Sequence, residues 1–156
     1  MAVTYRVATK SSEAEALLLD LVNAYEHAFE RAAETVALSA AQACVLGRLS
    51  EHRPMGALAE ELGCDASNIS QIVGRLEGLG LAYRETAPDD RRVRVVSRTT
   101  TGHQVSQRFE RSFSFARDAL ARLSGEEQDL LTSLLHKALG SAPAEHDLSD
   151  VDPPED

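Results

Sequence analysis

Apolar residues recur at helical spacing towards both ends of the chain. From about Ser12 to Glu34 they follow one another in steps of four and three residues, which predicts a single long amphipathic helix. A similar pattern predicts a second long helix after Gly102, and Ser124 with Glu127 three residues later marks the start of a last one. The apolar positions that define these stripes are Leu18, Val22, Tyr25, Phe29, Ala32 and Val36 in the first helix, Val105, Phe109, Phe113, Ala116, Leu120 and Leu123 in the second, and Leu131, Leu134, Leu135 and Ala138 in the last.

The middle of the chain is built from shorter elements. One helix is predicted after Ser39, a second from Gly56 to Leu62, and a third from Asp65 to about Gly78. Gly63 lies directly after the second of these helices, where a left-handed glycine commonly ends a helix. The last two helices are therefore joined by a tight turn, which is typical of a helix-turn-helix.

Behind the third of these helices the chain loses its helical period. Two β-prone runs, residues 81–85 and 93–96, flank the turn-forming sequence Pro88-Asp89-Asp90, which predicts a hairpin. Val95 and Val96 stand side by side and break the alternation of a half-buried strand, so the register of the second strand is left open. The predicted fold class is mainly α with a small β-hairpin.

The composition fits a globular helical protein of one domain. The 156 residues are 43% hydrophobic but only 4% aromatic and contain no Trp, so we expect a core of Leu, Val and Ala. The chain has no apolar run of the roughly 18 residues that span a bilayer, and its start does not read as a secretory leader. Cys44 and Cys64 do not form a disulfide framework. These features favour a location in the reducing cytoplasm.

The net charge of −9 is unevenly distributed along the chain. Residues 141–156 hold six acids and no Lys or Arg, and we expect this acidic tail to be disordered. The remaining residues 1–140 carry −3, and the stretch 66–98 contains six arginines against four acids. Since the local field governs how a protein meets a polyanion, the acidic total does not exclude a nucleic-acid partner.

The helix that starts at Asp65 and the hairpin behind it carry side chains suited to DNA. Asn and Gln can hydrogen-bond adenine at two points in the major groove, and paired guanidinium groups contact the backbone or enter the minor groove. The candidate DNA-binding residues are Ser67, Asn68, Ser70, Gln71 and Arg75 on the helix and Arg91, Arg92 and Arg94 on the hairpin. Two alternatives stay open: Ser67 and Asn68 could be capping or surface residues only, and the hairpin could be a solvated turn neutralised by Asp89 and Asp90.

An ordered set of short motifs runs through the chain, and each motif alone is a weak signal. The motifs are Leu38-Ser39-Ala40-Ala41-Gln42, Leu58-Ala59-Glu60-Glu61-Leu62-Gly63, Ile69 with Val73-Gly74-Arg75-Leu76-Glu77-Gly78-Leu79-Gly80-Leu81, Asp89-Asp90-Arg91-Arg92, and Thr99 with Gly102. In this order and at these intervals, with helices on both sides, they resemble the MarR family of transcriptional regulators. The resemblance spans most of residues 12–140.

The resemblance implies a winged helix-turn-helix over residues 38–99, flanked by dimerisation helices at residues 12–37 and 100–140, within a single domain of residues 1–140. It also implies a homodimer that presents a recognition helix and a wing from each subunit to double-stranded DNA. By the same resemblance Arg91 and Arg92 fall on the wing, where Asp90 orients an arginine. Gln71 stands where the family often has arginine, and Arg98 stands where it usually has an apolar residue.

The prediction is therefore a dimeric, cytoplasmic, sequence-specific DNA-binding regulator of transcription. We expect a repressor that binds a pseudo-palindromic operator and responds to a small molecule. A cleft between the dimerisation helices and the winged lobe would hold the effector, with Tyr25, His27 and Phe29 in its lining. The equally open alternative is that Tyr25 and Phe29 are ordinary core of the dimer.

Two other classes of function fit the sequence less well. A winged protein-interaction scaffold that no longer binds DNA would suit the acidic net charge but not the arginine-tipped hairpin. An enzyme on a helical scaffold lacks any recognisable nucleophile, phosphate-binding or zinc-protease motif. The five histidines lack metal-ligand spacing, and Cys44 and Cys64 read as structural residues, so neither a metal nor a cofactor is expected.

Overall fold

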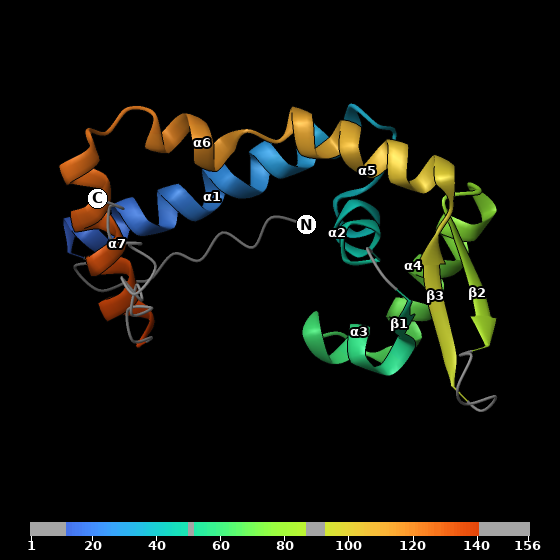
Figure 1. Cartoon of the computed structure of the whole chain (residues 1–156). Coiled ribbons are helices and arrows are strands. Elements are labelled where there is room, and N and C mark those ends of the chain that lie inside the picture. Colours follow the sequence, from blue (N-terminus) through green and yellow to red (C-terminus); the bar gives the residue numbers. More distant parts are fainter. Residues whose placement is uncertain (1–11, 50–51, 87–92, 141–156) are drawn as a thin grey trace, which may run out of the picture. The chain divides into compact units, whose positions relative to one another are not determined.

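The computed structural model describes residues 12–49, 52–86 and 93–140 (Figure 1). The chain divides into two compact units, residues 1–115 and 116–156. The helices are α1 (Glu13–Glu34), α2 (Ala40–Arg48), α3 (Met55–Glu61), α4 (Ala66–Gly78), α5 (Thr100–Ser112), α6 (Phe115–Leu120) and α7 (Gly125–Leu139). The first unit contains α1 to α5. None of the helices within the described residues is long and apolar enough to cross a membrane.

Serine caps begin three of the helices, as the sequence predicts. The hydroxyl of Ser12 accepts a hydrogen bond of 3.2 Å from the backbone N–H of Glu15 at the start of α1. Ser39 and Ser124 each form a full capping box with the residue three positions later. At the start of α4, Asp65 occupies the N-cap position, but its side chain makes no capping hydrogen bond.

The hairpin is part of a three-stranded antiparallel sheet in the order β1-β3-β2. Its strands are β1 (Arg53–Pro54), β2 (Ala82–Thr86) and β3 (Arg94–Arg98). The strands β2 and β3 pair from Ala82 opposite Arg98 to Thr86 opposite Arg94, which settles the register left open by the sequence. The predicted hairpin was therefore correct but incomplete, since its pattern gave no sign of the two-residue strand β1.

The central position of β3 explains why its sequence does not alternate. Val95 and Val96 are exposed by only 4% and 0%, although consecutive residues of a strand point to opposite faces. A strand that is covered on both faces has no polar side, and its apolar residues form a continuous run. The two adjacent valines are thus explained by the central position of β3 in the sheet and not by a shift in strand register.

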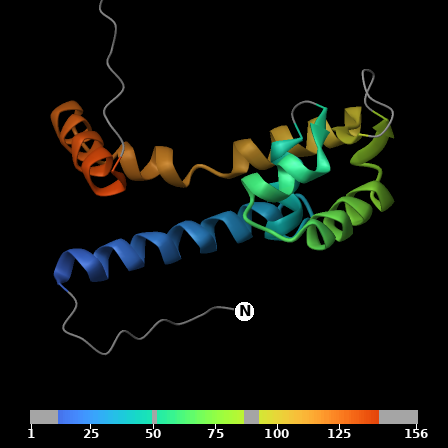
Figure 2. The same cartoon turned by 90° about the horizontal axis from the view of Figure 1, so that it is seen from below.

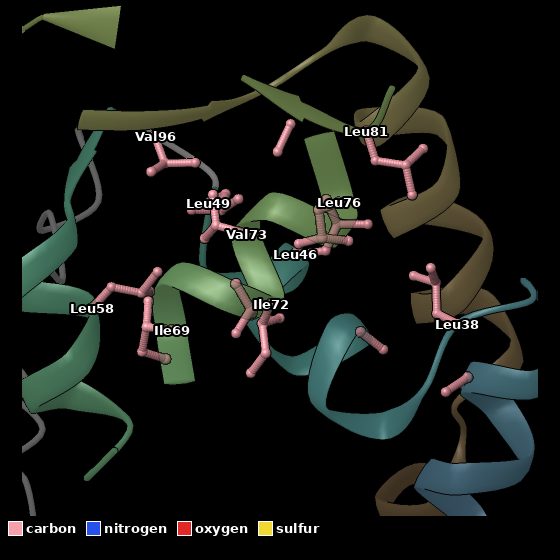
Figure 3. Packing of buried hydrophobic residues seen from close by; sticks show 14 of the residues in the cluster. Leu38, Leu46, Leu49, Leu58, Ile69, Ile72, Val73, Leu76, Leu81 and Val96 are labelled. Atoms are coloured by element: carbon pink, nitrogen blue, oxygen red, sulfur yellow. The ribbon is translucent and has the colours of Figure 1, made fainter. Parts of the chain in front are cut away.

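The hydrophobic core of the first unit lies where α4 packs against α2, α3 and the sheet (Figure 3). Its fully buried large side chains are Val45, Leu46, Leu49, Leu58, Ile69, Val73, Leu76 and Val96. The helix α1 joins this core only at its end, where Ala32 and Ala33 are buried, and the rest of α1 extends away from α2, α3 and α4 (Figure 2). Most of this core is therefore supplied by the winged segment, residues 38–99.

The single long helix expected after Gly102 is broken in two. The first part, α5, ends at Ser112, and Phe113 adopts an extended conformation with ψ of 90° before α6 begins at Phe115. The carbonyl of Phe109 accepts both the N–H of Phe113 at 2.9 Å and the hydroxyl of Ser112 at 2.8 Å at the end of α5. The ring of Phe113 packs edge-on against Phe29, with centroids 5.2 Å apart. The spacing of the apolar residues predicts the two helical segments but not the break between them.

The junction between the sheet and α5 depends on a close backbone approach at Gly102. A Cβ atom at this position would overlap the carbonyl oxygen of Leu81. The same junction is tied by Thr99, whose hydroxyl donates to the carbonyl of Gly80 at 2.7 Å and accepts from the N–H of Gly102 at 2.9 Å. The start of α5 is thereby fixed to the start of β2.

We expect Gly102→Ala to lower the free energy of unfolding by about 2–3 kcal/mol, because the added methyl group meets backbone rather than a flexible side chain. Chemical denaturation of the purified protein measures this change. The matched control is Gly47→Ala in α2, where an added Cβ meets nothing within 4 Å and helix propensity predicts a gain of up to about 1 kcal/mol. Equal effects of the two substitutions would contradict the role assigned to Gly102.

Candidate nucleic-acid interface

The orientation of α4 is set by its buried face. Ile69, Ile72, Val73 and Leu76 recur at helical spacing and are buried against the core (Figure 3). The turn from α3 into α4 passes through Gly63, which has a φ of +58°, a left-handed conformation that glycine adopts at low cost. The opposite face of α4 is therefore held outward.

That outward face carries all five candidate DNA-binding residues of the helix. The structure places Ser67, Asn68, Ser70, Gln71 and Arg75 as exposed residues of α4. Among the residues that the structure describes, none forms a hydrogen bond or ion pair with the side chains of Asn68, Gln71 or Arg75. These donors and acceptors are available to a partner without first breaking an interaction with any residue that the structure describes.

The candidate residues of the hairpin are only partly described. Arg91 and Arg92, together with Asp89 and Asp90, lie outside the described residues. Arg94 is the first residue of β3, is exposed, and donates to the hydroxyl of Thr86 on β2 at 3.3 Å. The structure thus shows the sheet that leads to the hairpin turn, with one of the three arginines on it.

One residue near this face was not singled out by the sequence analysis. Arg84 of β2 pairs with Glu77 of α4 at 2.8 Å and donates to the carbonyl of Ser70 at 2.8 Å. A second group, Arg48 and Arg53, pairs with Glu61 of α3 at 2.7 and 2.8 Å. The sequence shows these charges but not their partners, because the paired residues come from different elements.

The three residues suggested for an effector pocket do not lie together. Tyr25 and Phe29 stack at 6.2 Å and join the rings of Phe109, Phe113 and Phe115 in one aromatic cluster. His27 is instead exposed and lies 3.8 Å from Glu30 on the same helix. The cluster unites α1 with α5 and the residues that follow it, so Tyr25 and Phe29 share a site from which His27 is separated.

The two cysteines lie apart from the exposed face of α4 or at its edge, and each has a contact of its own. Cys44 is half-buried, with its sulfur 3.5 Å from Arg48 Nη1, and Cys64 is exposed in the turn, where its thiol donates to the carbonyl of Leu62 at 3.3 Å. Within residues 12–49, 52–86 and 93–140, no group of three or more His, Cys, Asp or Glu side chains is placed to hold a metal ion.

The winged segment matches known proteins in sequence. A sequence model described as the MarR family matches residues 38–93. Transcriptional regulator HosA of Escherichia coli O111:H- is 33% identical over 86 residues, and a Thauera aromatica protein named as a putative transcriptional regulatory protein for the hcr operon is 38% identical over 82 residues. These matches cover 54% and 52% of this chain. The chain spans 64% of HosA and about half, 49%, of the Thauera protein.

The structural similarity to known proteins covers more of the chain than the sequence matches do. The crystal structure of the S. aureus MepR–DNA complex superposes with a TM-score of 0.70, covering 85% of this chain and 100% of that one at 22% identity. At this identity the superposition establishes the fold, and the sequence match to the family model is confined to residues 38–93. The chain therefore matches the MarR family of transcriptional regulators over residues 38–93, and it has the fold of solved proteins that include MepR of S. aureus and MarR of E. coli.

Proposed function

We propose that the protein is a dimeric, sequence-specific DNA-binding regulator of transcription that acts as a ligand-responsive repressor. The observation that carries this proposal is the exposed polar face of α4, which its buried face holds outward beside an arginine-bearing sheet. A helix of this kind fits the major groove, which is about 12 Å wide. The solved structures with this fold include a MepR–DNA complex, which supports the same partner here.

The two parts of the interface have different tasks. Asn68 and Gln71 bind base edges, since an amide side chain can hydrogen-bond adenine at two points. Arg75 and the serines Ser67 and Ser70 contact bases or phosphates nearby. Arg91, Arg92 and Arg94 of the wing meet the backbone or the minor groove, where positive charge is favoured whatever the sequence.

A second copy of the chain completes the regulator. The helix α1 exposes an apolar surface made by Leu17, Leu18, Leu19, Leu21, Val22 and Tyr25, and α7 exposes Leu130, Leu134, Leu135 and Leu139. Soluble proteins rarely leave such large apolar surfaces in water, and a two-fold partner would bury them. Two-fold symmetry then presents two copies of α4 to half-sites about 34 Å apart on one face of DNA.

The aromatic cluster offers a route for a small molecule to influence DNA binding. It joins α1 to α5, and α5 continues directly from β3 of the wing. An apolar effector that enters among Tyr25, Phe29 and Phe113 would change how α5 lies on α1 and thereby the spacing of the two wings. The effect on DNA affinity is limited to the difference in the effector's affinity for the two arrangements.

We expect Asn68→Ala to weaken binding to an operator selected from random-sequence duplexes by about 1–3 kcal/mol, because alanine cannot hydrogen-bond the base edge. Binding to random DNA should change little. Fluorescence anisotropy with both duplexes measures the two affinities, and Asn23→Ala, an exposed asparagine of α1, is the matched control. Equal reductions on both duplexes would argue against base recognition by Asn68.

We expect Arg92→Ala to weaken binding to all sequences and to reduce the salt dependence of log K by about 0.9, the change that follows when one phosphate is no longer neutralised. Titrations over a series of KCl concentrations give this slope. The control is Arg111→Ala, which removes an exposed arginine of α5. A slope unchanged from that of the unaltered protein would exclude a phosphate contact at Arg92.

We expect Leu18→Asp to convert the dimer to a monomer, because it places a charge in the apolar surface of α1. Sedimentation velocity at micromolar concentration measures the mass, and operator affinity should fall with it. Asn23→Asp adds the same charge at a polar position of the same helix and should leave the dimer intact. A Leu18→Asp protein that remains dimeric would show that α1 is not the dimer interface.

A further inference from the structure

The wing strand β2 carries an arginine, Arg84, whose guanidinium group contacts α4 while the residue stays partly exposed. Arg84 Nη2 donates to the carbonyl oxygen of Ser70 at 2.8 Å and lies 3.5 Å from the Ser70 hydroxyl. Arg84 Nη1 pairs with Glu77 Oε2 at 2.8 Å, and the two side chains are exposed by 33% and 28%. One side chain of the sheet thus binds α4 at two residues that are about two helical turns apart.

Gly74 lies between these two residues on α4, beside the guanidinium group. A Cβ atom at Gly74 would be 4.0 Å from Arg84 Nη2, an ordinary van der Waals distance. The guanidinium group therefore lies over Gly74 of α4.

These hydrogen bonds fix α4 against the sheet in two respects. The planar fork of an arginine binds two oxygens only in a narrow range of orientations, so rotating or sliding α4 would break one bond or the other. The Ser70 carbonyl can accept from Arg84 while it also takes part in the helix, because a carbonyl oxygen has two lone pairs. The bond therefore adds a constraint without unwinding α4.

The ion pair with Glu77 also affects how strongly Arg84 can attract a phosphate group. Glu77 neutralises the guanidinium group, which leaves less charge to attract a phosphate than at an unpaired arginine. Ser70, whose carbonyl it binds, belongs to the exposed face of α4. We propose that Arg84, together with Glu77, is a positioning residue that sets the angle between the recognition helix and the wing, so that both reach DNA in register. This inference rests on the proposed function.

The test uses the full-length protein and the variants Arg84→Met, Arg84→Lys and Glu77→Gln. Affinities for the selected operator and for random DNA are measured by anisotropy over a range of salt concentrations. We expect Arg84→Met and Glu77→Gln each to lower the ratio of operator to random affinity by about tenfold, as the removal of a charge-assisted bond predicts. The salt slope on random DNA should stay unchanged. Arg84→Lys keeps the charge but not the fork, so it should not restore the ratio.

A phosphate contact by Arg84 would give the opposite pattern. Arg84→Met would then reduce the salt slope by about 0.9, and Glu77→Gln would free the guanidinium group and raise the affinity for both duplexes. Glu60→Gln is the matched control, since it removes the same charge from an exposed position of α3. A gain with Glu77→Gln that exceeds the gain with Glu60→Gln overturns the proposal.

A second measurement separates this inference from the proposed function. Amide hydrogen exchange without DNA should become faster in β2 and α4 of Arg84→Met and Glu77→Gln, while exchange in α1 stays as in the unaltered protein. Unchanged exchange in β2 and α4 overturns the positioning role whether or not the protein binds DNA. If the unaltered protein binds no DNA, the regulator function fails, and the exchange data alone then decide whether Arg84 couples the sheet to α4.

Discussion

The burial of one face of α4 is the constraint on which the rest of the structure depends. Ile69, Val73 and Leu76 are fully buried, and the helices α2 and α3 and the strand β3 contribute the side chains around them. A helix with one face fixed in a core has its opposite face fixed towards solvent. The polar residues Asn68 and Gln71 owe their exposure to this packing rather than to any property of their own.

The arginines of the winged segment fall into two groups, paired and unpaired, which the net charge of the chain does not distinguish. Arg48, Arg53 and Arg84 pair with acids of neighbouring helices and hold elements together. Arg75 and Arg94 are exposed and form no ion pair with any residue that the structure describes, so their charge is open to a polyanion. The division between structural and available arginines is therefore more informative about DNA binding than the total of −9.

Local signals in the sequence were reliable guides to local structure. The serine caps of α1, α2 and α7, the glycine turn at Gly63 and the two strands of the hairpin all appear where the sequence predicts them. The features that the sequence did not predict are those that depend on contacts between residues far apart in the chain. The strand β1 exists because it pairs with β3, and the break after Ser112 accompanies the packing of Phe113 on α1.

The sequence by itself determined the order of the main helices and the hairpin, the polar character of the helix that starts after Asp65, and the motifs that resemble the MarR family. These properties depend on residues close together in the chain, whose spacing can be read directly. Only the tertiary structure decided that Arg84 lies on α4, that His27 is separate from Tyr25 and Phe29, and that β3 is covered on both faces. Each of these features depends on which segments come into contact after folding. Such tertiary contacts are determined by the packing of the whole core.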